Sequence, residues 1–284
     1  MRVFPIGIIL ESLLQPIPQA LDTIQRLGAQ GVQVYTTRGE LSPENLSRQK
    51  KADFLKMVKD RGLAISALVG DLGHGFGDPA KNPGLISASK RILDLAGEWE
   101  TDIVTTHIGV VPSDPSHPRF RIMQDACGEL AEYADSLHAH FAVETGPETA
   151  GTLCAFLDSL HSTGVAVNMD PANLVMVTGD DPVAAVHILK KYIVHTHAKD
   201  GRKLFDKPPE RIYGIVADDV VTDPAFIELP LGEGDVPFKL YLQALRDIGY
   251  KGFLTIEREV GENPVRDVAN AVGFLRGLMQ SSTD

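Results

Sequence analysis

Eight short apolar segments recur along the chain, and each is followed by an amphipathic stretch. The apolar segments are Val3–Leu10, Gly31–Tyr35, Leu63–Val69, Asp102–His107, His140–Glu144, Val165–Asp170, Tyr192–His197 and Gly252–Glu257. The amphipathic stretches are Pro18–Leu27, Glu44–Lys59, Ser87–Glu98, Met123–His138, Thr149–His161, Pro182–Lys190, Phe238–Ile248 and Val265–Met279. Strands that alternate with helices favour a parallel sheet, and eight such units favour closure into a barrel. We therefore predict a single α/β domain, a (β/α)8 TIM barrel over residues 1–284.

Glycine and proline mark the expected element boundaries. Glycines that follow a helical pattern, where a left-handed helix cap is favoured, are Gly28, Gly62, Gly164 and Gly249. Prolines at expected helix starts are Pro43, Pro182, Pro237 and Pro264. Two long loops, His74–Gly84 and Asp200–Gly234, are expected after the third and seventh strands, where they extend the C-terminal face of a barrel.

Composition narrows the classes of partner. The formal net charge is −11, which disfavours a nucleic-acid or anionic-membrane partner. No apolar run reaches transmembrane length, and the first one lacks the cleavage site of a signal peptide, so we expect a cytoplasmic protein. The two cysteines, Cys127 and Cys154, have no partner at metal-binding spacing, and we expect both to be buried and reduced.

Four consecutive predicted strands end in a potential metal ligand. Alternate strand residues face the barrel interior, and this places Glu144, Asp170, His197 and Glu257 inward at the C-terminal mouth. Three carboxylates buried together require neutralisation. One divalent metal ion does this, and the oxygen-rich set favours Mn²⁺, Mg²⁺ or Co²⁺, with Zn²⁺ as a further option. The alternative is a salt-bridged barrel mouth that involves Lys199, Arg202 and Arg258.

Motifs at these strand ends resemble a known superfamily. They are Val143-Glu144-Thr, Asn168-Met-Asp170-Pro-Ala-Asn173-Leu, His195-Thr-His197-Ala-Lys199-Asp200-Gly, Leu231-Gly-Glu-Gly-Asp235 and Ile256-Glu257-Arg-Glu259. Together they resemble the xylose-isomerase-like sugar isomerases and epimerases, which include ketose 3-epimerases, inosose dehydratases and endonuclease IV. The resemblance to the ketose 3-epimerases implies that Glu144, Asp170, His197 and Glu257 hold one metal ion.

The same residues suit the chemistry of that group. A proton next to a carbonyl becomes removable when a metal stabilises the ene-diolate that forms, and two carboxylates can remove and return the proton. We therefore expect Glu144 and Glu257 to be both ligands and the acid–base pair. Candidate substrate-binding residues are His107, Asn173, His195, Lys199 and Arg202, although a purely structural role is a close alternative for His107, His195 and Lys199.

Two departures from the ketose 3-epimerases bear on the substrate. Asn173 stands where they carry a substrate-binding histidine, and Lys203, next to Arg202, stands where they carry an arginine. Both departures put a free ketohexose substrate in doubt. Asn173 and the segment Phe226–Pro230 also lack the additional ligands that a three-zinc site of the endonuclease IV type needs.

Three functions remain open at this point. The first is a metal-dependent isomerase or epimerase of carbohydrate metabolism that acts on a small sugar, polyol or sugar-derived acid. The second is a lyase of the inosose-dehydratase kind, and the third is a non-catalytic sugar-binding barrel. Family analogy and the long segment after the seventh strand also suggest a homo-oligomer.

Overall fold

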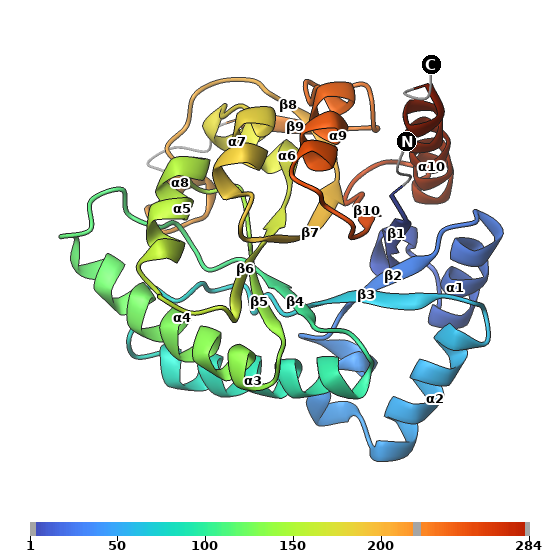
Figure 1. Cartoon of the computed structure of the whole chain (residues 1–284), viewed down its shortest axis with the longest axis horizontal. Helices are drawn as coiled ribbons and strands as arrows, with labels where there is room; N and C mark the ends of the chain where they lie inside the picture. Colours follow the sequence, from blue (N-terminus) through green and yellow to red (C-terminus); the bar gives the residue numbers. More distant parts are fainter. Residues whose placement is uncertain (1–3, 218–222, 282–284) are drawn as a thin grey trace.

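The computed structural model describes residues 4–217 and 223–281, and within them eight parallel strands close into a barrel (Figure 1). Around the ring the order is β1, β10, β7, β6, β5, β4, β3, β2, with every neighbouring pair parallel. The strands are β1 Ile6–Ile9, β2 Gly31–Tyr35, β3 Ala64–Val69, β4 Ile103–Thr106, β5 His140–Glu144, β6 Val165–Met169, β7 Ile193–Ala198 and β10 Leu254–Ile256. The predicted TIM barrel is confirmed; Val3, in the predicted first strand, lies outside the described residues.

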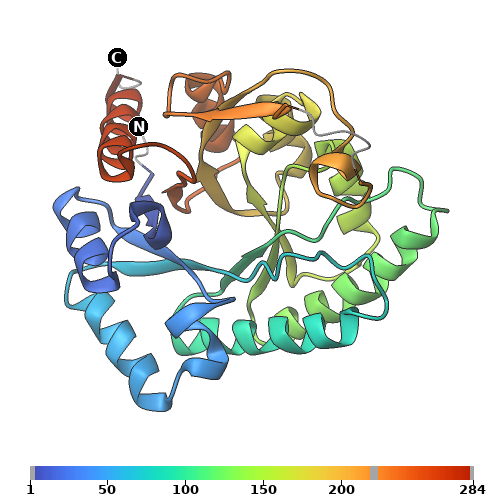
Figure 2. The same cartoon turned by 180° about the vertical axis from the view of Figure 1, so that it is seen from behind.

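Helices surround the strands, and the first strand pairs with the last, which closes the ring (Figures 1 and 2). The main helices are α1 Ile17–Arg26, α2 Arg48–Lys59, α3 Asn82–Glu98, α4 Pro118–Ser136, α5 Ala150–Asp158, α7 Pro182–Leu189, α9 Phe238–Asp247 and α10 Pro264–Ser281. Shorter helices are α6 Pro171–Asn173, α8 Pro209–Ile212, the 3₁₀ turns Leu10–Leu13, Gly39–Leu41 and Pro43–Asn45, and a π-helical turn at Leu174–Thr178.

Three helix starts differ from the prediction by more than one residue, and capping accounts for two of them. Ser47 accepts a hydrogen bond from the backbone N–H of Lys50, so α2 begins four residues later than expected. His117 accepts from the N–H of Arg119, and Pro118 follows it without an N–H, so α4 begins five residues earlier than expected. Helix α3 also begins five residues early, at Asn82, which shortens the loop that was predicted after the third strand.

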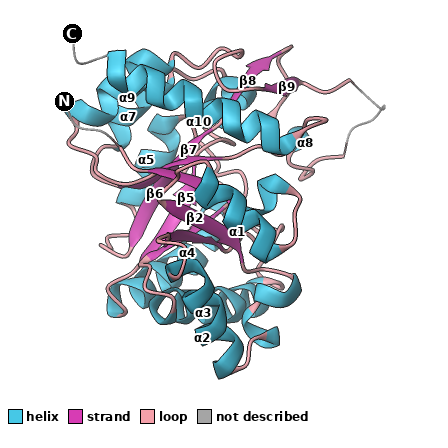
Figure 3. Ribbon diagram, turned by 90° about the vertical axis from the view of Figure 1, so that its right-hand side faces the viewer, coloured by secondary structure: helices cyan, strands magenta, loops and turns pink. Residues whose placement is uncertain are grey.

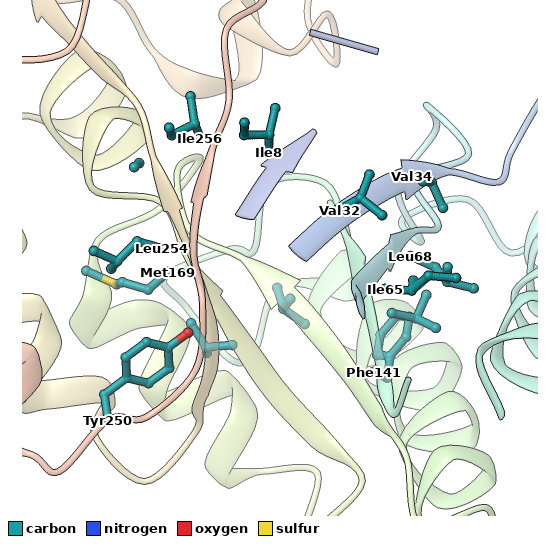
Figure 4. Packing of buried hydrophobic residues seen from close by; sticks show 14 of the residues in the cluster. Ile8, Val32, Val34, Ile65, Leu68, Phe141, Met169, Tyr250, Leu254 and Ile256 are labelled. Atoms are coloured by element: carbon teal, nitrogen blue, oxygen red, sulfur yellow. The ribbon is translucent and has the colours of Figure 1, made fainter. Parts of the chain in front are cut away.

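The hydrophobic core lies between the strands and the helices. Ile8, Val32, Leu68 and Phe141 are each no more than 1% exposed, and Figure 4 shows them with other strand residues of the core. Both faces of a parallel barrel strand are covered, and this is why the strands read as nearly continuous apolar runs.

The glycine prediction holds at three of its four positions. Gly28, Gly62 and Gly249 have φ of 72°, 68° and 76°, the left-handed conformation expected after a helix. Gly164 does not have a positive φ. A β-carbon there would overlap the carbonyl oxygen of Ala131 in α4, so Gly164 is required for close packing instead.

The segment after β7 is not the plain loop that was predicted. Strand β8 (Asp200–Lys203) pairs antiparallel with β9 (Phe226–Leu229), and Figure 3 shows this hairpin and α8 outside the ring of barrel strands. The Asp200 carboxylate fixes the base of the hairpin, because it accepts hydrogen bonds from the backbone N–H groups of Gly201, Gly232, Gly234 and Val236. Part of the predicted loop, residues 218–222, lies outside the described residues.

Two expectations about burial and membranes can be compared with the structure. Cys127 is fully buried, but Cys154 on α5 is only half-buried, which corrects the prediction for the second cysteine. Among the described residues, no helix is both long enough and apolar enough to cross a membrane.

Candidate metal centre

Four side chains from neighbouring strand ends meet at the C-terminal mouth of the barrel. Glu144 ends β5, Asp170 follows β6, His197 lies in β7 and Glu257 follows β10. One ligand atom from each lies within 4.8 Å of all the others. All four residues are buried, with exposed fractions between 0 and 7%. The predicted grouping of these four residues is therefore what the fold produces.

The imidazole of His197 lies among the three carboxylates. Its Nδ1 atom is 2.9 Å from Glu257 Oε2, 3.4 Å from Asp170 Oδ2 and 3.5 Å from Glu144 Oε1. Within the described chain, neither Asp170 Oδ2 nor Glu257 Oε2 accepts a well-aligned hydrogen bond, although both are buried and His197 Nδ1 lies close to each. Buried carboxylate oxygens without well-aligned donors are costly, and three oxygens and one nitrogen that converge in this way form a ligand set for a divalent cation.

Charge in the cluster is only partly balanced by protein cations. Burial raises the pKa of a carboxyl group, but Lys199 and His197 outweigh burial at Glu257, and the pKa of Glu257 lies below its ordinary value. At Asp170 burial prevails over His197 and Lys199, and the pKa of its carboxyl group is raised. Burial lowers the pKa of an imidazole, yet Glu257 and Glu144 raise the pKa of His197 well above its usual range.

The salt-bridge alternative accounts for only one of the three carboxylates. Lys199 Nζ lies 3.3 Å from Glu257 Oε2 and 2.7 Å from Glu259 Oε2. The two arginines named for this alternative are engaged elsewhere, Arg258 with Glu228 and Asp267, and Arg202 with Asp235. Among the described contacts, Glu144 and Asp170 thus have no lysine or arginine partner, and the cluster retains the negative charge that a metal ion would neutralise.

A second layer of hydrogen bonds orients Glu144. Asn168 Nδ2 donates to Glu144 Oε2 at 3.1 Å, and Asn173 Nδ2 donates to Glu144 Oε1 at 3.0 Å. His195 Nδ1 lies 2.9 Å from Asn168 Oδ1, and its Nε2 lies 2.9 Å from the Thr255 hydroxyl. Burial and the neighbouring His197 lower the pKa of His195, so His195 is neutral and its Nδ1–H donates to Asn168.

Gln33 on β2 is part of the centre, and the sequence analysis missed it. Its Oε1 atom is 3.1 Å from His197 Nε2, and its Nε2 donates to the Thr105 hydroxyl at 2.9 Å. If the Nε2–H of His197 donates to Gln33 Oε1, the lone pair of the ring lies at Nδ1, where it can bind a metal ion. The strand register shifts at Val32/Gln33 and at Val167/Asn168, so both inward amides stand at bulges, which are common beside active sites. A glutamine between two buried valines was the available sequence signal.

A cavity of about 300 Å³, the metal-side cavity, opens onto the cluster. Glu144, His197 and Glu257 line it, together with Tyr35 and Tyr213, which were not predicted. Of the candidate substrate-binding residues, His107, Asn173 and Lys199 also line it.

The other two candidate residues do not line this cavity. His195 is buried behind the ligands, in contact with Asn168 and Thr255. Arg202 lies on β8 with its side chain 49% exposed, and its Nε donates to Asp235 at 2.9 Å. The structure therefore gives neither side chain direct access to a ligand bound in the metal-side cavity.

The eight-stranded barrel and the four potential metal ligands at its C-terminal mouth agree with what comparison with known proteins shows. Residues 21–278 match the family model of the xylose isomerase-like TIM barrel, and the chain belongs to that family. This confirms the resemblance that the strand-end motifs indicated.

Individual relatives are distant. Fructoselysine 3-epimerase of Escherichia coli O157:H7 is 24% identical over 259 residues, which cover 85% of each chain. The crystal structure of a xylose isomerase domain protein from Planctomyces limnophilus superimposes with a TM-score of 0.80 at 25% identity and covers 98% of each chain. A xylose isomerase-like TIM barrel protein from Mycobacterium smegmatis, in complex with magnesium, superimposes with a TM-score of 0.73 at 18% identity over the full length of both chains.

Proposed function

We propose that this protein is a divalent-metal-dependent isomerase or 3-epimerase of a small hydroxycarbonyl carbohydrate, and that residues 1–284 form its one catalytic domain. The convergence of Glu144, Asp170, His197 and Glu257 within 4.8 Å carries the proposal. The similarity to a fructoselysine 3-epimerase over 85% of the chain supports a sugar substrate.

The four side chains are proposed to hold one divalent metal ion, with Mn²⁺, Mg²⁺ or Co²⁺ favoured by the oxygen-rich donors. Bound there, the ion supplies Lewis-acid stabilisation to adjacent oxygens of the substrate. Gln33 holds His197 with Nδ1 toward the cluster, and Asn168 and Asn173 fix both oxygens of Glu144. Ligands held in place in this way do not need to reorganise when the substrate binds.

Glu144 and Glu257 are the proposed acid–base pair. Both line the metal-side cavity from different strands, and the pKa of each lies below its ordinary value because nearby cations outweigh burial. A charged carboxylate on one side of the substrate removes the proton next to the carbonyl. The other glutamate must first take up a proton, from solvent or from a substrate hydroxyl group. Delivery of that proton to the opposite face inverts the carbon, and return of the abstracted proton to the neighbouring carbon moves the carbonyl group.

Three further side chains are proposed to contact substrate hydroxyl groups. His107 lies beside Glu144, with Nε2 3.5 Å from Oε1, and Asn173 and Lys199 line the same cavity. Lys199 is only 5% exposed, so it is a fixed donor rather than a mobile surface lysine.

Solvent-deuterium exchange tests the proposal directly. The metal-loaded protein is incubated in D₂O with D-fructose, D-tagatose, D-psicose and fructoselysine, and loss of the C3 proton signal is followed by NMR. We expect metal-dependent exchange with at least one ketose, and we expect Glu144→Gln and Glu257→Gln each to reduce it by at least about 100-fold.

Glu129→Gln provides the matched control, because Glu129 is exposed on α4 and pairs with Lys90 far from the cavity. This variant is expected to match the wild type. Exchange that continues in both active-site variants, or that does not depend on added metal, would refute the proposed mechanism. The metal content of each variant is measured together with its exchange rate. A variant that retains the metal ion but no longer exchanges has lost the acid–base group and not the metal site.

A further inference from the structure

A second cavity of about 430 Å³ adjoins the metal-side cavity. Asp71, His107 and Tyr213 line both cavities, so the two meet at these three side chains. The rings of His107 and Tyr213 are 6.1 Å apart between centroids. A ligand with its reactive carbons beside Glu144 therefore has additional enclosed space beyond His107.

Two glycine-containing loops build the second cavity. A β-carbon on Gly75, whose φ is +59°, would lie 2.7 Å from the carbonyl oxygen of Ile108 and 2.8 Å from Cα of Gly109. The loops after β3 and β4 can therefore come this close only with glycine at position 75. Phe76 anchors the first loop, because it is 3% exposed, packs edge-on against Phe141 and donates its N–H to Ile108. Tertiary contacts thus hold both loops in place around the cavity.

Arg119, in the first turn of α4, brings an incompletely satisfied guanidinium to the second cavity. Its side chain is 19% exposed and lines the cavity. The Nε–H is buried and has no acceptor among the described residues, and the ion-pair contact of Nη2, with Glu210, is long at 3.8 Å. A guanidinium presents five donors in a fork that matches a carboxylate or phosphate, so an anion is the group that it lacks.

The acidic residues of this cavity are engaged by their own loop. Asp71 accepts a hydrogen bond from the N–H of Gly73, and Asp78 accepts from the N–H of Ala80. Lys81 also lines the cavity, but its side chain is 57% exposed, whereas that of Arg119 is 19% exposed. Arg119, with a buried Nε–H that lacks an acceptor among the described residues, is therefore the more fixed donor for an anion in the cavity.

We propose that the second cavity binds an anionic tail of the substrate, a phosphate or carboxylate, through Arg119 while the hydroxycarbonyl head lies beside Glu144 and Glu257. The inference rests on the proposed function, because it places the reacting head in the metal-side cavity.

The test compares three probes with one sugar head: D-fructose, D-fructuronate and D-fructose 6-phosphate. Dissociation constants are measured by calorimetry on the manganese-loaded protein. We expect the wild type to bind one anionic probe at least about tenfold more tightly than D-fructose, which corresponds to about 1.4 kcal/mol. The tail is a carboxylate if D-fructuronate binds more tightly than D-fructose 6-phosphate, and a phosphate if the order of affinity is reversed.

Variants assign the effect to Arg119. Arg119→Met is expected to lose the preference and Arg119→Lys to retain part of it. Arg121→Met on the same helix is the control, since Arg121 is 73% exposed and pairs with Asp125, and it is expected to keep the preference. Thermal unfolding of each variant shows that the comparison concerns folded protein.

Equal affinity of the wild type for all three probes would overturn the inference, as would a preference that persists in Arg119→Met. The two proposals fail separately. Deuterium exchange without any preference for an anionic probe leaves the proposed function intact and removes the tail site. An Arg119-dependent preference without exchange leaves the tail site and removes the proposed function.

Discussion

Replacement of Asp170 by asparagine is expected to have opposite effects with and without metal. Asp170 is fully buried, its Oδ2 accepts no well-aligned hydrogen bond among the described residues, and its Oδ1 accepts from the N–H of Asn173 at 2.9 Å. An asparagine retains the Oδ1 acceptor and the side-chain volume. The change therefore removes one buried negative charge and little else.

The size of the effect follows from the distances in the cluster. Ligand atoms of Glu144 and Glu257 lie within 4.8 Å of Asp170, and at an effective dielectric constant of about 20 each repulsion costs at least about 3.5 kcal/mol. The attraction to His197 at 3.4 Å returns about 5 kcal/mol. Lys199 adds a further attraction, but burial of the Asp170 charge opposes both cations and prevails. Without metal, the variant should thus be more stable by about 2 kcal/mol. For 284 residues this corresponds to a rise of about 3 °C in the unfolding midpoint.

Metal reverses the order of stability. A ligand at 100 times its dissociation constant stabilises the native state by about 2.7 kcal/mol, or about 4–5 °C for a chain of this length. Asp170→Asn should lose most of that gain because one charged ligand is absent.

Differential scanning calorimetry with EDTA and with excess Mn²⁺ measures both effects. Asp125→Asn, an exposed carboxylate beside Arg121, is the control and should behave as the wild type in both conditions. An Asp170→Asn protein that is less stable than the wild type in EDTA, or that keeps the full manganese shift, would refute the reasoning.

Three other perturbations have defined outcomes. His195→Phe should retain metal but lower kcat by about tenfold, because the N–H that orients Asn168 is lost, and steady-state kinetics with metal analysis would show this. Burial raises the pKa of Glu148 to about 8. The folded state therefore holds a proton that the unfolded state has released, and stability falls between about pH 5 and pH 8. Glu148→Gln should gain stability relative to the wild type by up to about 1.4 kcal/mol per pH unit over that range, measured by urea unfolding; a pH-independent difference would contradict the burial argument. Gly75→Ala should destabilise the protein by about 1–3 kcal/mol, because its β-carbon meets Ile108 at a positive φ, and an unchanged midpoint in urea would show that the loop gives way easily.

The sequence alone determined the barrel and its four-residue centre, since both depend on repeated local patterns. Strand periodicity fixes which side chains face inward, and eight strand–helix units favour closure, so Glu144, Asp170, His197 and Glu257 converge by topology. The same reasoning missed Gln33, because a single inward amide on β2 contacts His197 only across the barrel, between residues 164 positions apart.

Tertiary structure decided the environment of the charged side chains. Lys199 and Arg202 are only three residues apart in the sequence, yet the ammonium is buried against Glu257 whereas the guanidinium is exposed beside Asp235. The β8–β9 hairpin causes this difference, since it begins between them and turns the chain out of the barrel. The second cavity likewise depends on the approach of two loops at Gly75. Such contacts join positions far apart in the chain, and no local periodicity encodes them.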